Sequence, residues 1–507
     1  MVRTKSISKL LIANRGEIAV RIARACRELG IRSVAVYSQP DAEALHARLA
    51  DEAIEIGPAE SSQSYLNIER VLAAAKSSAA DALHAGYGFL AENADFAEAV
   101  IAAGLIWVGP PPAAMRAMGD KAGARALMEK VGVPVLPGYQ GKDDPESLKK
   151  AARQIGYPLL VKASAGGGGM GQRVANRADE LDEVIVAARR ESQHAFGDGR
   201  LILEKYLPQA RHVEIQVLGD QHGNLLHLFE RECSLQRRRQ KIVEESPSPL
   251  LDDVSRARIA SAALTAAKAV GYANAGTVEF LVDPQSKKFY FLEMNTRIQV
   301  EHPVTELVTG IDLVQWQVRV AAGDKLSFKQ AELSQKGHAI ECRIYAEDPA
   351  VSFLPQAGRV LRLRLPAMER EAKTRIDSGV AEGDMVSSHY DPLLAKVIVH
   401  AKDRSSALQR MREAMHNTAI LGMTTNIDFL QDLLAHKDVE AGVFDTRFVE
   451  REFADWQSQQ ELPHEALIAA LLTELGLPGV NRVSAKADGE DVYSPWDTPT
   501  GFRIGGR

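Results

Sequence analysis

The chain of 507 residues has few cysteines and no long apolar run, and both absences limit what it can be. Its three cysteines form no CxxC pair, which predicts buried thiols in a reducing compartment. No run of about 18 apolar residues occurs, and the start of the chain lacks an apolar stretch of signal-peptide length. The net charge of -6 gives no reason to expect nucleic acid or an anionic membrane as a partner. We therefore expect a cytoplasmic protein.

The first hundred residues alternate between strand and helix patterns. Residues 9–14 and 32–38 are typical of buried strands, and residues 16–30 between them carry apolar side chains at helical spacing. This alternation predicts a doubly wound parallel sheet. A Rossmann dinucleotide site needs GxGxxG after the first strand, and ANRGEIA at 13–19 does not supply it. NAD binding is therefore disfavoured.

The rest of the chain divides by changes of pattern. Mixed strand and helix patterns follow Pro110-Pro111-Pro112, and a pattern typical of an α+β domain begins near residue 338. Beyond about residue 455 the chain is polar and irregular, apart from an amphipathic helix predicted over 463–476. No internal repeat or low-complexity tract is present. The predicted segments are 1–118, 119–330, 331–455 and 456–507.

A glycine-rich loop follows one of the predicted strands. In VKASAGGGGMGQRV, residues 161–174, Lys162 precedes the glycines, whereas a Walker loop places its lysine after them. A lysine on a strand can contact a nucleotide phosphate while a glycine lid brings its N–H groups onto the outer phosphates. We expect the lid to close over ATP and to be mobile without it. A flexible structural turn remains the alternative.

Two acidic residues face each other in a predicted hairpin. Glu279 and Glu293 each lie seven residues from Ser286, so a symmetric register places them opposite one another. Facing carboxylates repel unless a cation lies between them. A divalent ion bound to a triphosphate fits, with Asn295 on the same strand face as Glu293. The alternative is a pair of solvated acids.

Polar side chains are concentrated in two further stretches. The segment that follows the hairpin is too polar to form part of a hydrophobic core. Its side chains suit the recognition of a small planar anion beside a base. A basic run at 237–241 borders predicted strands, where it would counter the acidic hairpin or its ligands; a solvated surface is the alternative reading. The residues concerned are Arg297, Gln299, Glu301, His302, Arg237, Arg238, Arg239 and Lys241.

An ordered set of motifs extends over residues 8–450. The most specific is EMNTRIQVEHPVTE at 293–306. The others include LIANRGEIAVRIARACRELG, HAGYGFLAENADFAE, MGDKAGAR, VKASAGGGGMGQRV, RHVEIQVLGD, ERECSLQRRRQK, ECRIYAEDP and HYDPLLAKVIVHA. Together these motifs resemble those of the biotin carboxylase family, which combines an ATP-grasp fold with N- and C-terminal biotin carboxylase domains. FDTRFVE and DVYSPWDTPTGFRIGG further resemble α subunits of acyl-CoA carboxylases of the methylcrotonyl-CoA or geranyl-CoA type.

The resemblance implies a fold for each segment. Residues 1–118 would form an N-terminal biotin carboxylase domain with a Rossmann-like parallel sheet, and residues 119–330 an ATP-grasp domain. Residues 331–455 would form a C-terminal α+β biotin carboxylase domain. Residues 456–507 would be a linker and the start of a subunit-docking region. The expected fold class is therefore α/β followed by α+β.

The resemblance also implies an activity, the carboxylation of biotin by ATP and bicarbonate through carboxyphosphate. Glu301 would deprotonate bicarbonate, and Arg343 would stabilise the biotin enolate. Mg²⁺ or Mn²⁺ would be held by Glu279, Glu293 and Asn295. Bicarbonate would be bound by Lys241, Arg297, Gln299 and the backbone of Val300, and the biotin ring by Tyr87 and Asp391. The nucleotide would be contacted by Lys121, Lys162, Gly166, Gly167, Gly168, Gly169, Gly171, Glu204, Lys205, Leu207, His212 and Gln236.

The sequence departs from the family at four positions near the predicted nucleotide and biotin sites. Ala165 and Met170 stand in the glycine loop where members often carry glycine and a basic residue. Arg239 replaces a usual histidine, and Ala85 replaces a usual proline. None of these is a proposed base or metal ligand. We expect the chemistry to survive, with nucleotide affinity or lid kinetics altered.

No AMKM-like segment for biotin attachment occurs in the sequence. Biotin is therefore expected as a substrate on a carrier domain that either was truncated from this chain, which we favour, or is a separate protein. The resemblance implies a homodimer or a larger assembly with a carboxyltransferase (β) subunit docking near 460–507. That subunit, rather than this sequence, would select the final acyl-CoA.

Two other functions are consistent with parts of the sequence. Another ATP-grasp ligase, of the carbamoyl-phosphate or purine type, would share the nucleotide motifs but lack ECRIYAEDP and HYDPLLAK. A catalytically inactive assembly subunit would have lost the base or the acidic pair, whereas Glu279, Glu293 and Glu301 are all present. ATP hydrolysis that depends on bicarbonate and biotin would distinguish these functions.

Overall fold

The computed structural model describes residues 5–163, 172–366, 374–458 and 464–474. The chain divides into two units, Met1–Gln457 and Ser458–Arg507. The described part of the second unit contains the helix α16 (His464–Glu474), close to the predicted range. Within the described residues, no helix is long and apolar enough to cross a membrane.

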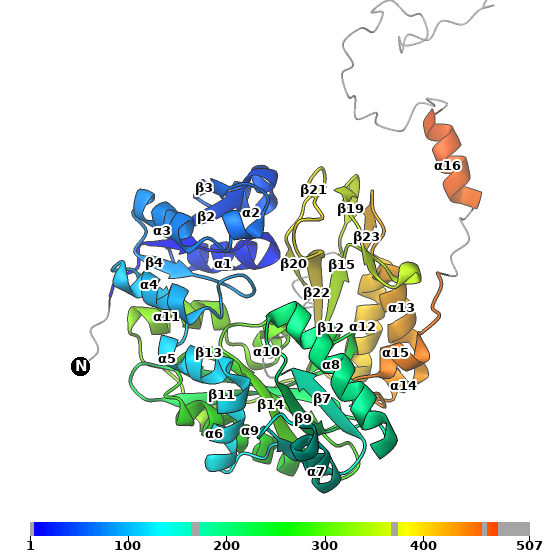
Figure 1. Cartoon of the computed structure of the whole chain (residues 1–507). Helices are drawn as coiled ribbons and strands as arrows, with labels where there is room; N and C mark the ends of the chain where they lie inside the picture. Colours follow the sequence, from blue (N-terminus) through cyan, green and yellow to red (C-terminus); the bar gives the residue numbers. More distant parts are fainter. Residues whose placement is uncertain (1–4, 164–171, 367–373, 459–463, 475–507) are drawn as a thin grey trace, which may run out of the picture. The chain divides into compact units, whose positions relative to one another are not determined.

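A parallel five-stranded sheet of order β3-β2-β1-β4-β5 forms the N-terminal part (Figure 1). Leu10 and Ile12 of its central strand pack with the helix α1 on one side, whereas Leu11 packs with α4 on the other. Apolar residues on both faces are what a doubly wound parallel sheet requires, so the predicted fold is confirmed here. The elements are β1 (Lys9–Ile12), α1 (Gly16–Glu28), β2 (Arg32–Ser38), α2 (Leu45–Leu49), β3 (Glu52–Gly57), α3 (Ile68–Ser77), β4 (Ala82–His84), α4 (Ala94–Ala102) and β5 (Ile106–Val108).

The predicted strand with Lys162 lies in a separate antiparallel sheet of order β6-β9-β7-β8. The glycine run lies between β7 and β8 in the chain, and its residues 164–171 are outside the described residues. Two helices pack against this sheet and bury Leu159 and Val161. The elements are α5 (Pro112–Gly119), α6 (Lys121–Lys130), β6 (Gly138–Tyr139), α7 (Pro145–Ile155), β7 (Leu159–Ala163), β8 (Arg173–Ala175), α8 (Leu181–Phe196) and β9 (Leu201–Lys205).

A third sheet of eight strands, with order β14-β13-β10-β11-β12-β15-β22-β20, is antiparallel throughout. It joins strands from both sides of residue 330, where the sequence predicts a domain boundary. Val213 and Ile215 pack under α9, whereas Glu214 between them faces the opposite side and is fully buried. The elements are β10 (Arg211–Gly219), β11 (Leu225–Arg237), β12 (Gln240–Ser246), α9 (Asp253–Ala269), β13 (Asn274–Val282), β14 (Phe289–Asn295), β15 (His338–Tyr345), β20 (Thr374–Ser378) and β22 (Leu393–Ala401).

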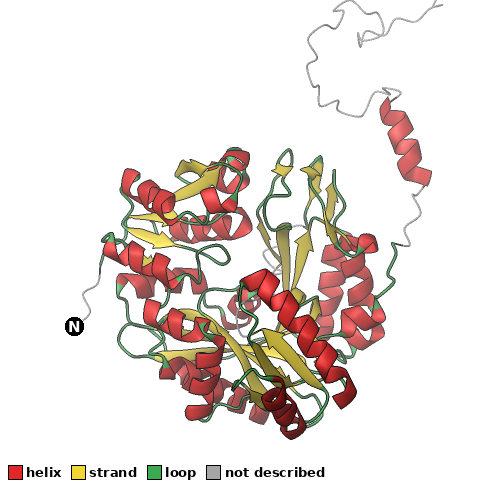
Figure 2. Ribbon diagram, viewed as in Figure 1, coloured by secondary structure: helices red, strands yellow, loops and turns green. Residues whose placement is uncertain are grey.

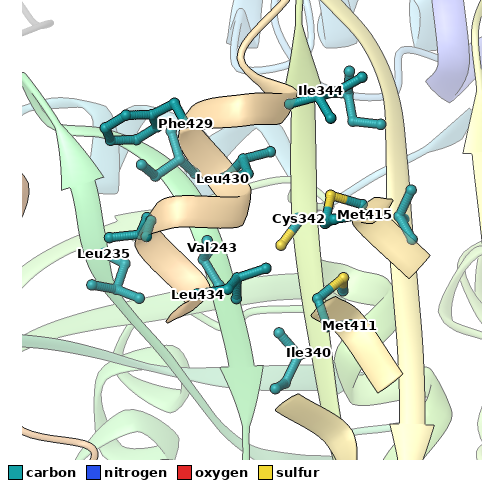
Figure 3. Packing of buried hydrophobic residues seen from close by; sticks show 14 of the residues in the cluster. Leu235, Val243, Ile340, Cys342, Ile344, Met411, Met415, Phe429, Leu430 and Leu434 are labelled. Carbon is teal, nitrogen blue, oxygen red and sulfur yellow. The ribbon is translucent and has the colours of Figure 1, made fainter. Parts of the chain in front are cut away.

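Helices α12 and α13 cover the far end of this sheet (Figure 2). Figure 3 shows Phe429, Leu430 and Leu434 of α13 facing Cys342 and neighbouring side chains of the strands. All three cysteines of the chain are buried and unpaired, as predicted. The remaining elements are α10 (His302–Thr309), α11 (Leu313–Ala322), β16 (Glu347–Asp348), β17 (Leu354–Pro355), β18 (Gly358–Arg359), β19 (Arg362–Arg364), β21 (Met385–Val386), α12 (Arg404–His416), β23 (Ala419–Leu421), α13 (Ile427–Ala435), α14 (Lys437–Glu440) and α15 (Phe448–Glu452).

The core under α13 yields a stability prediction. Leu434→Ala leaves a cavity among fully buried neighbours and should lower the free energy of unfolding by about 2–5 kcal/mol. Leu361→Ala is the control, because that side chain is 65% exposed and should change stability little. Chemical unfolding curves of both variants measure the difference. Equal stability of the two variants would contradict the packing described here.

Candidate active site

A row of charged side chains crosses four strands on one face of the eight-stranded sheet. Glu293, Glu279, Glu214 and Arg231 lie opposite one another in register, on β14, β13, β10 and β11. A bulge beside Glu279 inserts Leu292 as an extra residue of β14, and this insertion brings the predicted acidic pair into register. The row gathers three carboxyl groups, which need nearby cations.

The acidic pair has the chemistry of a metal site. Burial raises the pKa of Glu293, and the neighbouring Glu279 raises it further. Asn295 donates from Nδ2 to Glu279 Oε1 at 2.8 Å. Carboxylate and amide oxygens are the ligands that Mg²⁺ and Mn²⁺ prefer, and a cation would relieve the repulsion between the two acids. Glu279, Glu293 and Asn295 therefore fit a divalent ion.

Lys241 connects this acidic pair to the proposed base. Its ammonium lies 2.5 Å from Glu214 Oε2, 2.9 Å from Glu279 Oε1 and 2.6 Å from Glu301 Oε1. Burial disfavours its charge, but the attraction of these three carboxylates outweighs burial and raises the pKa of Lys241 well above its usual range. Lys241 is therefore charged, and Glu301 lies beside the acidic pair as the sequence-based hypothesis requires.

Glu301 is buried between two cations at the start of α10. Besides Lys241, the Arg343 guanidinium donates from Nη2 to Glu301 Oε2 at 2.9 Å. Burial opposes ionisation, but Lys241 and Arg343 hold the pKa of Glu301 well below its usual range. The carboxylate is therefore ionised and able to accept a proton. A substrate anion that draws Lys241 away would make it a stronger base.

The predicted biotin contacts lie around Arg343. Arg343 Nε donates to Glu244 Oε1 at 2.5 Å, and its Nη1 lies 3.4 Å from the Tyr345 hydroxyl. Burial raises the pKa of Tyr345 to about 12 and that of Tyr87 well above its usual range. Arg343 and Asp391 both act electrostatically on Tyr87. Tyr87, which is a neutral phenol, therefore lies near both Arg343 and Asp391.

The predicted bicarbonate residues surround Glu279 and Glu301. Arg297 Nε lies 3.2 Å from Glu92, and its Nη2 donates to Asn295 Oδ1 at 3.0 Å. Gln299 donates to Glu279 Oε1 at 2.8 Å and accepts from Arg231 at 2.8 Å. Together with Lys241, these side chains form a buried site with positively charged groups that could bind a small anion.

The predicted nucleotide residues form two groups. Lys121, His212 and Gln236 lie near the acidic pair: Lys121 acts electrostatically on Glu293, His212 Nε2 is 3.1 Å from Glu279, and Gln236 pairs in register with Lys241. The other group consists of Lys162 on β7, Glu204 and Lys205 on β9, and Leu207 after β9. There Lys162 Nζ is 2.6 Å from Glu204 Oε2.

Two further nucleotide predictions concern the chain around β9, and one concerns the lid. Lys205 donates to the carbonyls of Gly156 and Tyr157 at 3.3 and 2.8 Å, so its ammonium is held by backbone. Leu207 lies two residues after the end of β9. The five glycines of the lid, Ala165 and Met170 belong to residues 164–171, outside the described residues.

Several site residues were missed by sequence reasoning. Arg231 is fully buried and donates to Glu214, Gln216, Thr305, Thr277 and Gln299 at 2.6, 2.7, 3.0, 3.0 and 2.8 Å. Glu244 holds Arg343, and Glu92 holds Arg297. The alternation of polar and apolar residues in RHVEIQVLGD was the available signal, because Glu214 and Gln216 share a face with His212.

Three family models match consecutive parts of the chain. They are "Biotin carboxylase, N-terminal domain" over residues 6–115, "Carbamoyl-phosphate synthase L chain, ATP binding domain" over 120–329 and "Biotin carboxylase C-terminal domain" over 341–451. Together with the acidic pair and the positively charged groups beside it, these matches define an ATP-grasp enzyme of the ligase class.

Two relatives narrow this class of enzyme. The chain is 49% identical over 502 residues to the mitochondrial methylcrotonoyl-CoA carboxylase subunit alpha of Rattus norvegicus, covering 98% of this chain and 70% of the relative. It is 51% identical over 445 residues to biotin carboxylase 1 of Bacillus subtilis, covering 88% of this chain and 98% of the relative. The chain belongs to the biotin carboxylase family.

Solved structures agree with this membership. A biotin carboxylase complex from Campylobacter jejuni superposes with a TM-score of 0.84 at 44% identity, covering 88% of this chain and 99% of that chain. The biotin carboxylase domain dimer of Hydrogenobacter thermophilus 2-oxoglutarate carboxylase, solved with MgADP, ADP and bicarbonate, has a TM-score of 0.85 at 45% identity, covering 90% and 99%.

The buried Arg231–Glu214 pair yields a second prediction. Arg231→Met removes five buried hydrogen bonds and one of the two cations that hold Glu214, which keeps Lys241, and it should lower the free energy of unfolding by about 3–5 kcal/mol. Adding Glu214→Gln should recover part of this loss. Chemical unfolding measures both. Arg32→Met is the matched control, because its pair with Glu52 lies at the surface and should matter little. An equal effect of the two arginine variants would contradict the described role.

Proposed function

We propose that this chain carboxylates biotin with ATP and bicarbonate, as the first half-reaction of an acyl-CoA carboxylase of the methylcrotonyl-CoA or geranyl-CoA type. The observation that carries the proposal is the position of Lys241, whose ammonium contacts both Glu279 of the acidic pair and the base Glu301. This contact puts a metal-nucleotide site and a bicarbonate site side by side. The relatives named above support the same reaction.

In the first step, bicarbonate is held by Lys241, Arg297, Gln299 and the N–H of Val300. The ionised Glu301 removes its proton. An oxygen of the resulting dianion attacks the γ-phosphorus of ATP, the bond to the bridging oxygen breaks, and ADP leaves. The product is carboxyphosphate. Lys241 and Arg297 stabilise the negative charge that develops during this attack.

In the second step, carboxyphosphate breaks into CO₂ and phosphate. The phosphate takes the proton of the biotin ureido nitrogen, and that nitrogen attacks CO₂. Arg343 stabilises the enolate oxygen that forms on the ureido group, because Glu244 and Glu301 hold its guanidinium in place. Tyr87 and Asp391 would orient the ring beside it.

The chain would bind its nucleotide and metal with the residues already described. Glu279, Glu293 and Asn295 would hold Mg²⁺ or Mn²⁺, which when bound neutralises charge on the phosphate oxygens. Lys121 and Lys162 would contact the phosphates, and the described residues of the remaining set would hold the nucleoside: Glu204, Lys205, Leu207, His212 and Gln236. Gly166, Gly167, Gly168, Gly169 and Gly171 would form the lid.

The assembly around this chain is also a proposal. Biotin would arrive on a carrier domain, and a carboxyltransferase (β) subunit would use the carboxybiotin, with this chain in a homodimer or a larger assembly. The proposed division is into residues 1–118, 119–330, 331–455 and 456–507, and the family-model ranges support the first three of these segments. Cytoplasmic location is proposed from three unpaired, buried cysteines, and cell fractionation tests it.

Replacing the base tests the proposed reaction. Glu301→Gln cannot accept the bicarbonate proton, so ATP hydrolysis that depends on bicarbonate and free biotin should fall by about 10²–10⁴-fold. The affinity for ATP should change little. Glu69→Gln, in the exposed first turn of α3, is the control and should retain full activity. Undiminished turnover of Glu301→Gln would show that another group is the base.

A further inference from the structure

Lys396 is a fully buried lysine that the reaction above does not use. Its ammonium donates to the Val300 carbonyl at 2.8 Å and lies 3.1 Å from Glu17 Oε1. Asp377 is farther away, at 3.7 Å, and pairs more closely with Arg375, at 2.7 Å. A buried ammonium is costly without partners, so the carbonyl and Glu17 account for its position.

The bond to Val300 acts directly on the base. The Val300 carbonyl and the Glu301 amide belong to one planar peptide unit, so a donor that holds the carbonyl also holds the Cα of Glu301. The side chain of Glu301 is held separately, by Lys241 and Arg343. Lys396 therefore restrains the backbone of a residue whose carboxylate must be placed within a fraction of an ångström.

The link continues to the predicted biotin side. Glu17 Oε1, which contacts Lys396, also accepts a hydrogen bond from the Tyr87 hydroxyl. Glu17 is buried at the start of α1, and burial raises its pKa although Lys396 opposes this. Tyr87, Glu17, Lys396 and the Val300 carbonyl thus form a continuous chain of polar contacts.

We propose that Lys396 is a positioning residue for Glu301, and that Glu17 connects it to Tyr87. The biotin side and the bicarbonate side of the site are thereby joined through contacts between α1, β22 and the segment after β14. This inference rests on the proposed function for its kinetic consequences. A purely structural Lys396 would instead lower stability without selecting one substrate.

Kinetics of three variants test the link. Lys396→Met should raise the KM for bicarbonate about tenfold and lower kcat by up to about 100-fold, with the KM for ATP within about twofold of wild type. Tyr87→Phe removes only the hydroxyl that contacts Glu17, and it should raise the KM for bicarbonate as well as that for biotin. The Tyr87→Phe variant also tests the link on its own if Lys396→Met does not fold.

Lys9→Met is the matched control. Lys9 donates to the Ser78 carbonyl at 2.7 Å and pairs with Glu52 at 2.9 Å, in the N-terminal sheet. It repeats the chemistry of Lys396 without contacting the site, so all three KM values should be unchanged. A rise in the KM for ATP equal to that for bicarbonate in Lys396→Met, or an unchanged KM for bicarbonate in Tyr87→Phe, would overturn the proposal.

Hydrogen exchange gives a readout that does not need turnover. Amides in residues 298–302 should exchange faster in Lys396→Met than in wild type and Lys9→Met, because the peptide loses its restraint. Unchanged exchange there would also overturn the link. If wild type shows no bicarbonate- and biotin-dependent hydrolysis, the proposed function fails, while the exchange comparison still decides whether Lys396 restrains Glu301.

Discussion

The site depends on one buried ammonium, that of Lys241, held between Glu214, Glu279 and Glu301. Three carboxylates buried so close together could not all stay ionised without a cation. Lys241 keeps Glu301 ionised, and it connects this proposed base to the acidic pair. Two further cations compensate the carboxylates: Arg231 pairs with Glu214, and Arg343 pairs with Glu301. Removing any of these charges would change the ionisation of the others.

The eight-stranded sheet brings these buried charges of opposite sign together. Its strands place the charged side chains on one face, while alternate residues such as Val213 and Ile215 pack into the apolar layer under α9. The sheet joins β12 to β15, and so brings Arg343 to Glu244 and Glu301. Strands carry Lys241, Glu279 and Arg343, whereas Glu301 lies in the turn before α10. Its carboxylate is held in place by Lys241 and Arg343, which suits a reaction that needs accurate placement.

Much of the fold and part of the site could be predicted from local sequence. Strand β2 and the helix α1 follow from periodicity, and the Glu279–Glu293 hairpin follows from symmetric spacing about its turn. The bulge at Leu292 that completes the register was not predictable, because it depends on packing. The helices α13 to α15 and the partners Glu92 and Glu244 were also missed, since their contacts lie far away in sequence.

The sequence by itself determined the family, the parallel N-terminal sheet and the candidates for the reactive groups, because motif spacing and apolar periodicity are local properties. Only the tertiary structure decided the protonation of those groups and their connections. The pKa values of Lys241 and Glu301 depend on burial and on charges from distant strands, which no local pattern specifies. The link from Tyr87 through Glu17 and Lys396 to Val300 likewise depends on the contact of Glu17 with Lys396, which lie far apart in the sequence.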